Sequence, residues 1–469
     1  MSHLATRLEE ARRQLHGAYG FRDFRPLQRR VVQSVLAGRD ALAVLPTGGG
    51  KSICFQIPAV VLGGVTIVVS PLVALMQDQV NALKSRGIAA DSLNSLMPAE
   101  DQQAVRRRLA DRTLRLLYVS PERAERLAQD LAALSIRPSL LAVDEAHCIS
   151  EWGHDFRPSY RAIGRVREAV GSPPTIALTG SATPPVRADI VSSLGLRRPD
   201  EHLGSFDRPN LRFGVVGLGH RRERMPLLLS RLEQRPGLTI IYVSTRNAAD
   251  ALAQRLWFAG HRTAAYHAGL TRERRSEVLD RFLAEDLDVV VATSAFGMGI
   301  DAPRVRLVVH WGMPPTPEAY YQEAGRAGRD GQASCCLLLH HRTDASIHRR
   351  QLEVTFPARK VLEEIWRHRE RRRFHPAGVV ASADRLAREL RPGDGPVDWS
   401  RIRLRRDAAR RRLGVMERYA TGHRCRRRVL LGYFGETVRG CAGCDACSAP
   451  RSLDRLRSAL GLARAGARG

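Results

Sequence analysis

The sequence predicts an α/β fold of two tandem parallel-sheet domains followed by a helical, cysteine-bearing C-terminal region. Three observations support this. Between residues 40 and 340, short apolar runs alternate with longer amphipathic segments, the pattern of a parallel sheet wound with helices. The alternation forms two series, joined across residues 204–235. After residue 340 the strand patterns end, and arginine-rich helical segments lead to a cluster of cysteines.

The expected strands are short, apolar and rich in β-branched residues. In the first series they cover residues 41–45, 66–70, 114–119, 140–144 and 175–179. In the second series they cover residues 239–244, 262–267, 289–293, 307–310 and 334–340. Helical patterns fall between them, for example at 104–112 and 247–258, and three more follow at 358–373, 381–389 and 402–420. We see no repeat of solenoid type.

The composition excludes a wholly disordered chain, because 43% of the 469 residues are hydrophobic and 26% are charged. The net charge is unusual: 75 Lys+Arg face 48 Asp+Glu, giving +27. Genome base composition can explain why all but three of these cations are arginine, but not the excess itself. Residues 341–469 alone carry +17. The charge therefore indicates a polyanionic partner, nucleic acid first and an anionic membrane surface second.

No targeting or membrane-spanning segment is expected. The N-terminus is charged and lacks the apolar stretch of a signal peptide. The long uncharged run 57–76 is interrupted by Gly63, Gly64 and Pro71, so it predicts the end of a helix, a turn, a buried strand and a loop. We therefore expect a cytoplasmic, nucleoid-associated protein without a membrane partner.

A glycine loop follows the first expected strand: Pro46–Ser52 reads PTGGGKS and precedes a helix starting near Ile53. Glycines let backbone N–H groups approach a phosphate, Lys51 can reach the outer phosphates and Ser52 can ligate Mg²⁺. The full G-x-x-x-x-G-K-[ST] pattern fails at its first glycine, which is Leu45. The alternative is a flexible glycine turn with an incidental lysine.

A pair of carboxylates, Asp144 and Glu145, opens the sequence DEAH directly after the apolar run 139–143. Carboxylates at the carboxyl end of a parallel strand face the crevice where ligands bind. Asp144 is expected to hold Mg²⁺ and Glu145 to polarise an attacking water. The alternative is a solvated turn with a chance acidic pair.

Four of the eight cysteines cluster late, as Cys425-x₁₅-Cys441-x₂-Cys444-x₂-Cys447. Four thiolates without an open position predict a structural, tetrahedral Zn²⁺ site. Fe–S ligation and unligated structural cysteines are the alternatives.

These motifs resemble superfamily 2 helicases and, more narrowly, the RecQ family of ATP-dependent DNA helicases. Five stretches between residues 19 and 447 carry the resemblance. They are the segment 19–28, DEAHCISEWGHDFRP at 144–158, FDRPNLRF at 206–213, ATSAFGMGID at 292–301 with YYQEAGRAGRDG at 320–331, and the cysteine cluster 425–447.

The resemblance implies two tandem RecA-like domains and a helical, zinc-binding C-terminal region. The implied organisation is a first RecA-like domain at 1–204, a second at 205–345, an Arg-rich helical insertion at 346–415, a zinc module at 416–450 and a basic tail at 451–469. Residues 341–415 are longer than the family's usual link. With 22 residues after Cys447, we expect a short form without the winged-helix and HRDC domains and their strand-separating hairpin.

The resemblance also implies ATP- and Mg²⁺-dependent unwinding with 3′→5′ polarity in recombination and repair, and it implies roles for residues. Arg25 and Gln28 would contact adenine with Phe21 stacked on it, and Arg326 or Arg329, three apart on one helix face, would be an arginine finger. The implied catalytic residues are Lys51, Asp144, Glu145, His147, Gln322, Arg326 and Arg329. The implied ATP-binding residues are Phe21, Arg25, Gln28, Thr47, Gly48, Gly49, Gly50, Lys51 and Ser52. Mg²⁺ would be held by Ser52 and Asp144, and Zn²⁺ by the four cysteines.

The implied DNA contacts are Trp152, Phe156, Arg157, Arg246 and His267, with Ser70-Pro71 and Ser120-Pro121 also at family positions that grip the backbone. The expected partners are single-stranded and partially duplex DNA, together with single-strand-binding and repair proteins. Alternatives stay open for several of these residues. Trp152 and Phe156 could instead lie in the core, and Arg326 and Arg329 could belong to a solvated basic face. His147 could instead be a metal ligand. For the function of the whole protein, the alternatives are an RNA helicase, and a remodelling or strand-annealing protein with weak unwinding activity.

Overall fold

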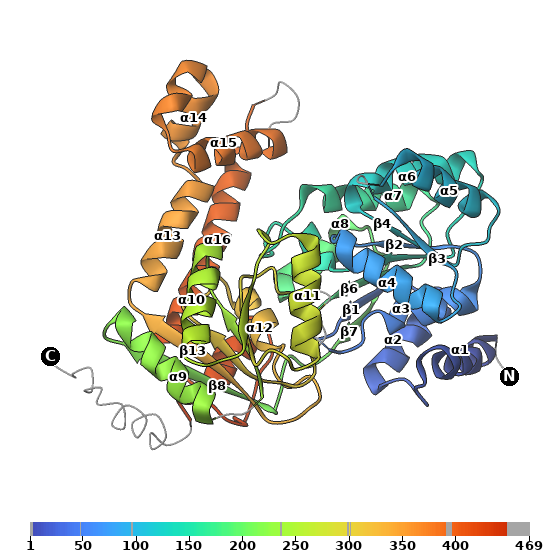
Figure 1. The fold of residues 1–469 in the computed structure, drawn as a ribbon. Coiled ribbons are helices and arrows are strands. Elements are labelled where there is room, and N and C mark those ends of the chain that lie inside the picture. The colour runs from blue at the N-terminus through green and yellow to red at the C-terminus, as the bar shows by residue number, and fades with distance from the viewer. Residues whose placement is uncertain are drawn as a thin grey trace. The chain divides into compact units, whose positions relative to one another are not determined.

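The computed structural model describes residues 3–46, 48–94, 97–234, 237–297, 300, 302–390 and 396–447 (Figure 1). Thr47, implied in ATP binding, and the basic tail 451–469 lie outside the described residues. The chain divides into two compact units, Met1–Phe206 (unit 1) and Asp207–Gly469 (unit 2).

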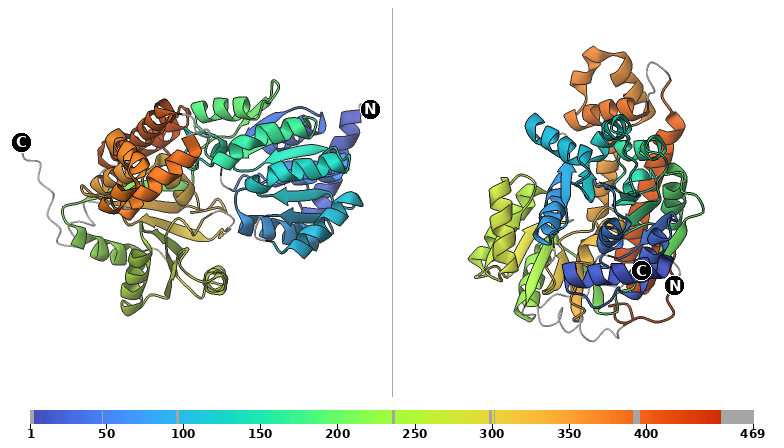
Figure 2. Two further views of the ribbon diagram at one scale, coloured as in Figure 1. Left: turned by 90° about the horizontal axis from the view of Figure 1, so that it is seen from above. Right: turned by 90° about the vertical axis from the view of Figure 1, so that its right-hand side faces the viewer.

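Unit 1 is built on a seven-stranded sheet in the order β3-β4-β2-β5-β6-β1-β7, and every neighbouring pair is parallel. The strands are β1 (Ala41–Val44), β2 (Thr66–Val69), β3 (Ala90–Leu93), β4 (Leu116–Val119), β5 (Leu140–Val143), β6 (Thr175–Thr179) and β7 (Asp200–Leu203). The five inner strands are buried along their whole length, because helices cover both faces of the sheet (Figure 2).

The helices of unit 1 connect these strands. They are α1 (His3–Tyr19), α2 (Pro26–Leu36), α3 (Ile53–Leu62), α4 (Val73–Ser85), α5 (Ala99–Ala110), α6 (Pro121–Ala133), α7 (Ile163–Ala169) and α8 (Pro184–Ser193), with short 3₁₀ helices η1 (Ala146–Ile149) and η2 (Pro158–Ala162). The segment 57–76 comprises the end of α3, a turn, β2 and a loop, as predicted, and then the start of α4, which was not predicted there. Within the described residues, no helix has both the length and the apolar character needed to cross a membrane.

Unit 2 contains a second parallel sheet, in the order β10-β11-β9-β12-β13-β8. Its strands are β8 (Leu211–Leu218), β9 (Leu238–Tyr242), β10 (Thr263–Tyr266), β11 (Val289–Ala292), β12 (Val305–His310) and β13 (Ser334–His341). Its helices are η3 (Arg221–Glu223), α9 (Arg224–Gln234), α10 (Arg246–Phe258), α11 (Arg272–Leu283) and α12 (Pro317–Ala324).

The predicted fold class is confirmed, and each of the ten expected strands is present. Three strands, β3, β7 and β8, were not predicted, and all three lie at sheet edges. An edge strand needs no continuous apolar run: β7 alternates half-buried and exposed residues, and β8 is interrupted by Gly214 and Gly217.

The C-terminal part of unit 2 is helical. It comprises α13 (Asp344–Thr355), α14 (Arg359–Arg367), η4 (Arg369–Phe374), α15 (Ala377–Leu390), α16 (Trp399–Thr421) and α17 (Arg426–Tyr433). The boundaries expected at 345/346 and 415/416 fall inside α13 and α16, so these divisions need correction. The end of α16 belongs to the sheet's core, because Leu413, Met416 and Tyr419 are buried against it.

A buried ion pair holds the start of β1 in unit 1. Arg167 Nη2 donates to Asp40 Oδ2 over 2.7 Å, and both side chains are about 95% buried. Asp40 also accepts the backbone N–H groups of Thr175, at the start of β6, and Arg197. One carboxylate therefore joins the chain before β1 to the neighbouring strand and to the segment before β7.

Asp40→Ala is expected to lower the free energy of opening β1 and β6 by roughly 3–5 kcal/mol, because it leaves the buried Arg167 charge uncompensated. Native-state hydrogen exchange of peptides from these strands measures it. The control is Asp288→Ala, which breaks the exposed pair with Arg262 and is expected to cost about 0–1 kcal/mol. Equal costs in the two variants would contradict a structural role for Asp40.

Candidate nucleotide site and metal centre

The glycine loop lies between β1 and α3, as the sequence predicts. Gly48 and Gly50 have φ angles of +80° and +70°, which glycine adopts without strain. A Cβ on Gly50 would lie 2.3 Å from Nε2 of Gln28, and one on Gly49 would lie 2.8 Å from the Pro46 carbonyl oxygen. The loop thus requires glycine for space as well as for conformation, which a merely flexible turn would not.

The upstream residues predicted to read adenine contact this loop directly. Gln28 Nε2 donates to the carbonyl oxygens of Gly49 (3.0 Å) and Gly50 (3.3 Å). Arg25 Nη1 donates to the Gly48 carbonyl over 2.8 Å, and Arg25 N–H donates to Gln28 Oε1 over 3.0 Å. Phe21 is 53% exposed, so its ring is accessible to a planar ligand. Arg25 and Gln28 therefore join the start of α2 to the loop.

Lys51 and the carboxylate pair meet at the carboxyl edge of the sheet. Lys51 Nζ donates to Glu145 Oε1 over 2.9 Å, and the Glu145 N–H donates to Asp144 Oδ1 over 2.9 Å. Glu145 adopts the left-handed conformation (φ +45°), which turns the chain sharply after β5. The side chain of Ser52 does not cap α3, so its hydroxyl is not committed there.

The pKa values of the two carboxyl groups shift in opposite directions. Burial and the neighbouring Glu145 raise the pKa of Asp144. Burial would also raise the pKa of Glu145, but Lys51 and His147 outweigh it, so the pKa of Glu145 is lowered. Glu145 is thus held as a carboxylate, with its second oxygen, Oε2, 3.3 Å from His147 Nδ1.

His147 connects the ends of two neighbouring strands. Its Nδ1 lies 3.0 Å from Thr179 Oγ1 at the end of β6, and the same hydroxyl accepts the Ser181 N–H. Cys148 and Asp155 lie within metal-binding reach of His147, a grouping that sequence spacing did not indicate. The Cys148 thiol donates to Asp155 over 3.7 Å.

The loop that carries Trp152, Phe156 and Arg157 folds back on the turn after β5. Trp152 is 36% exposed, whereas Phe156 and Arg157 are half-buried, so the aromatics are not core residues. Arg157 Nη1 donates to the Pro71 carbonyl over 2.8 Å. A Cβ on Gly153 would lie 2.9 Å from the His147 carbonyl oxygen, which shows how closely this loop packs on the DEAH segment.

In unit 2, Arg326 and Arg329 lie in the turn that follows α12, and the prediction of a shared helix face is wrong. The helix ends at Ala324, and Gly328 takes φ +55°, where a Cβ would lie 2.5 Å from Asn210 Nδ2. Arg208 Nη2 and Asn210 Nδ2 donate to the Gly328 carbonyl at 2.7 and 2.8 Å. The FDRPN segment therefore holds the turn, a contact that no local sequence pattern indicates.

The two arginines of this turn differ in their partners. Arg326 is 93% buried and interacts with the Tyr242 hydroxyl, but its buried Nε and Nη1 have no hydrogen-bond partner among the described residues. Arg329 Nη1 donates to the Ile300 carbonyl over 2.7 Å. Gln322 is half-buried on α12. A buried guanidinium with unsatisfied donors costs free energy, which an anionic ligand would recover.

The two other predicted DNA contacts of unit 2 flank one turn. Arg246 is exposed at the start of α10, whereas His267 is buried and bonded through Nε2 to Asp250 Oδ1 (2.9 Å). A Cβ on Gly269 would lie 3.1 Å from both Arg246 Cδ and His267 Nδ1. His267 thus shapes the turn from inside, and Arg246 is the member of this pair that solvent reaches. Ser70 and Ser120, at the other backbone-gripping positions, are buried.

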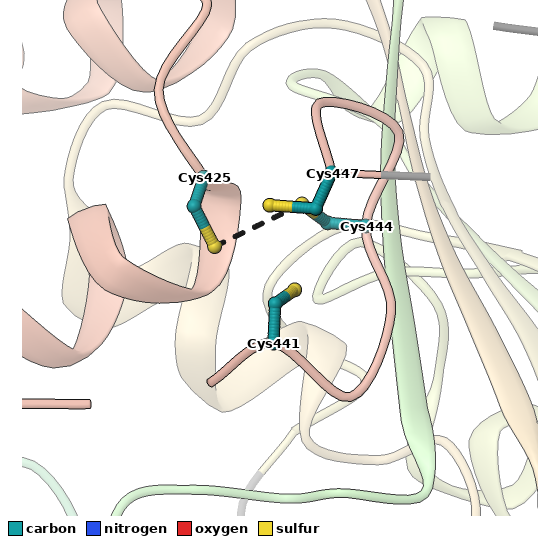
Figure 3. Close-up of side chains that lie close together, drawn as sticks. All are labelled: Cys425, Cys441, Cys444 and Cys447. Atoms are coloured by element: carbon teal, nitrogen blue, oxygen red, sulfur yellow. Dashed lines mark hydrogen bonds between the residues drawn. The ribbon is translucent and has the colours of Figure 1, made fainter. Parts of the chain in front are cut away.

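The four late cysteines converge on one point (Figure 3). Their sulfur atoms all lie within 4.8 Å of one another, and the Cys425 and Cys444 sulfurs are 3.9 Å apart. Cys425 stands at the start of α17 and the other three come from the loop 441–447, where Gly443 takes φ +144°. This donor set, all thiol, fits a structural Zn²⁺.

The cysteine loop joins the edge of the second sheet. Asp445 N–H donates to the Phe213 carbonyl over 3.0 Å, forming an isolated bridge beside β8. Arg426 Nε and Nη2 each lie 2.9 Å from an Asp445 carboxylate oxygen. Arg427 is 99% buried and donates to the Leu211 carbonyl over 2.6 Å and to Asp207. The structural role of Arg426 and Arg427 was not predicted from the sequence, because both lie in a run of arginines that is typical of an exposed, charged surface.

Family models match most of the chain. The model described as DEAD/DEAH box helicase matches residues 25–190, the helicase conserved C-terminal domain matches 222–331, and RecQ zinc-binding matches 397–448. The ATP-dependent DNA helicases RecQ of Pasteurella multocida and Haemophilus influenzae are each 37% identical over 94% of this chain. The chain spans 63% and 64% of their lengths.

The probable ATP-dependent DNA helicase RecS of Bacillus subtilis is 35% identical over 94% of this chain and 92% of its own length. The chain belongs to the RecQ family. Among solved structures, Dbp5 of Saccharomyces cerevisiae bound to RNA and ADP BeF3 matches 74% of this RecQ-family chain and 92% of its own, with a TM-score of 0.58. Lhr of Mycobacterium smegmatis bound to ssDNA and AMP-PNP matches 89% and 57%, with a TM-score of 0.54. At 17% and 20% identity, these two support the fold alone.

The RecQ zinc-binding match begins at residue 397, just before α16, and therefore places α16 with the cysteine loop rather than with an insertion. The sequence resemblance to the RecQ family is thus confirmed, and the zinc module extends further toward the N-terminus than expected.

We expect the purified chain to carry one Zn²⁺, and Cys444→Ser to lose it. The ion and the folding of α17 are coupled, since Cys425 begins α17 and Cys444 bridges to β8. Metal analysis and thermal unfolding measure both effects. Cys335→Ser, a cysteine outside the cluster, is the control and should keep the metal. A Cys444→Ser protein with full metal content would contradict the assignment.

Proposed function

We propose that this protein is an ATP-dependent DNA helicase that translocates 3′→5′ on single-stranded DNA and unwinds duplexes in recombination and repair. The observation that carries the proposal is the pairing of Lys51 with Glu145 beside a glycine loop in which a Cβ on Gly49 or Gly50 would lie less than 3 Å from a neighbouring atom. These residues lie in a RecQ-family chain, and RecQ-family relatives are described as ATP-dependent DNA helicases.

Lys51 is proposed to exchange its partner during the ATPase cycle. In this structure its ammonium pairs with Glu145. ATP phosphates offer a stronger anion, so Lys51 moves to them and leaves Glu145 free to accept a proton from the attacking water. While Lys51 is paired with Glu145, its ammonium and His147 lower the pKa of Glu145. Release of Lys51 removes part of this lowering, so Glu145 becomes a stronger base for the step. Ser52 and Asp144 would hold Mg²⁺, which neutralises charge on the phosphates when bound. Arg25, Gln28 and Phe21 are the proposed adenine contacts.

Arg326, rather than Arg329, is the proposed arginine finger. Arg326 retains two buried N–H-bearing nitrogens without a partner among the described residues, whereas Arg329 is bonded to the Ile300 carbonyl. In this role Arg326 would stabilise the charge that develops on the γ-phosphate in the transition state. His147 in unit 1 and Gln322 in unit 2 are proposed to communicate the binding and hydrolysis of ATP to the rest of their own unit.

The proposed DNA contacts in unit 1 are Trp152, Phe156 and Arg157. The loop that carries them begins directly after the DEAH segment and packs on the His147 carbonyl. A strand stacked on Trp152 therefore acts on the same turn that positions Glu145. Arg246, with the turn shaped by His267, is the proposed phosphate contact of unit 2. The proposed substrates are single-stranded and partially duplex DNA in the nucleoid, with single-strand-binding and repair proteins as partners.

ATP turnover is expected to rise with single-stranded DNA, and strand displacement to occur on 3′-tailed but not 5′-tailed duplexes. Turnover and displacement assays on the same preparation test this. Turnover without DNA stimulation would contradict translocation. Stimulation without displacement would favour a remodelling or annealing protein, and stimulation by RNA alone an RNA helicase.

Lys51→Ala is expected to abolish turnover and to leave single-stranded DNA binding unchanged, because the ammonium contacts phosphates of ATP rather than of DNA. Lys84→Ala, an exposed lysine paired with Asp91, is the matched control and should keep full turnover. Turnover by the Lys51→Ala protein would show that the loop assignment is wrong.

Arg326→Gln is expected to lower kcat by about 10³-fold or more, the range in which arginine fingers act. Arg329→Gln should cost far less if Arg329 only supports the turn. A larger loss in Arg329→Gln than in Arg326→Gln would reverse the assignment. ATP binding, followed with a fluorescent analogue, should remain in both variants.

A further inference from the structure

One part of unit 2 has no role in the proposed ATPase chemistry: α14, η4 and α15, which we call the helical finger. It lies at the ends of α13 and α16 that are farthest from β13 (Figure 1). The finger has its own core, since Leu362, Ile365, Leu386 and Leu390 are buried together with Ile402 at the start of α16. It is therefore a folded element with its own hydrophobic packing.

Ion pairs fix η4, the tip of the helical finger, on both sides. Arg371 Nη1 lies 3.3 Å from Glu364 Oε1 of α14. Arg372 pairs with Asp384 of α15. These charges hold the tip to its two supporting helices, so the residues between them are presented in a defined conformation.

Arg373 and Phe374 take no part in the ion pairs that hold η4 to its supporting helices. Phe374 is 72% exposed and is not a member of the finger's core. The Arg373 guanidinium carbon lies 4.9 Å from the centre of the Phe374 ring. No carboxylate of the described residues pairs with Arg373. A large apolar side chain exposed to this extent on a folded tip contributes little to packing and is typical of a contact surface.

The surroundings of this pair favour a polyanion over a protein partner. Residues 359–390 hold nine Lys+Arg against five Asp+Glu. Arg367, Arg371 and Arg373 are all exposed around the tip. An aromatic ring with a guanidinium beside it stacks the face of a nucleic-acid base, while arginines bind the phosphates. A base offers its face only where the strand is unpaired or at the end of a duplex.

We infer that the tip of the helical finger is a single-stranded DNA contact, in which Phe374 stacks on an unpaired base and Arg373 binds an adjoining phosphate. The inference rests on the proposed function, because it takes DNA as the substrate. It adds a contact outside both sheets, in a segment to which the family models assign nothing.

The first test is binding of the full-length chain to a fluorescent oligothymidine, followed by anisotropy. Phe374→Ala should weaken binding by about 5- to 100-fold, the effect of removing one stacking aromatic, and Phe374→Trp should restore it. Phe258→Ala is the matched control, since Phe258 is also 72% exposed but lies on α10. Circular dichroism should be unchanged, because neither side chain lies in a core.

The second test is the salt dependence of the same binding. Arg373→Gln should lower the slope of log K against log salt concentration by about 0.7, the value for one phosphate contact on a single strand. Arg274→Gln removes an exposed arginine paired with Glu277 and should leave the slope unchanged.

The outcomes separate this inference from the proposed function. If the unmodified chain binds DNA and shows DNA-stimulated turnover, but Phe374→Ala and Arg373→Gln bind like it, the finger contact is overturned and the helicase proposal stands. Equal weakening by Phe258→Ala also overturns it. So does unchanged DNA binding by Phe374→Ala with loss of self-association in sedimentation, which would assign the tip to a second copy. An unmodified chain that fails to bind DNA overturns both proposals.

Discussion

The candidate nucleotide site depends on one constraint, the parallel pairing of β1, β5 and β6. Parallel strands end at the same edge, so the segments that follow them meet although they are far apart in the chain. The glycine loop follows β1, the DEAH turn follows β5, and Thr179 ends β6. Lys51 to Glu145, Glu145 to His147 and His147 to Thr179 then form a continuous series of contacts. The buried Asp40–Arg167 pair secures the opposite ends of β1 and β6.

Unit 2 is organised by arginines that act inside the fold. Arg208 fixes the turn that carries Arg326, and Arg427 bonds the carbonyl oxygens of Arg208 and Leu211 from the start of α17. The cysteine loop continues the edge beside β8 through Phe213. The metal module and the arginine turn therefore share one bonded framework.

The large positive charge has several roles. Part of it is structural: Arg167, Arg224, Arg405 and Arg427 are buried in ion pairs. Of the arginine-rich stretch 401–412, Arg405 is bonded to Glu389, whereas Arg403, Arg410 and Arg411 are exposed. Because each of these ion pairs contains one charge of each sign, the pairs leave the net charge of +27 unchanged. The exposed arginines of the C-terminal helices carry part of the surplus that is available for a polyanion.

The sequence by itself determined the fold class, ten strands and the family, because buried parallel strands are continuous apolar runs and the motifs are contiguous. The roles of the individual site residues stay predictions. Only the tertiary structure decided how those residues pair. It showed that Lys51 pairs with Glu145 and that Arg326 and Arg329 have different hydrogen-bond partners. It also showed that His267 is buried, whereas Arg246 is exposed to solvent. Edge strands and the limits of the C-terminal helices were missed for a related reason. Their boundaries are set by hydrogen bonding and packing between distant segments, and no local pattern records such contacts.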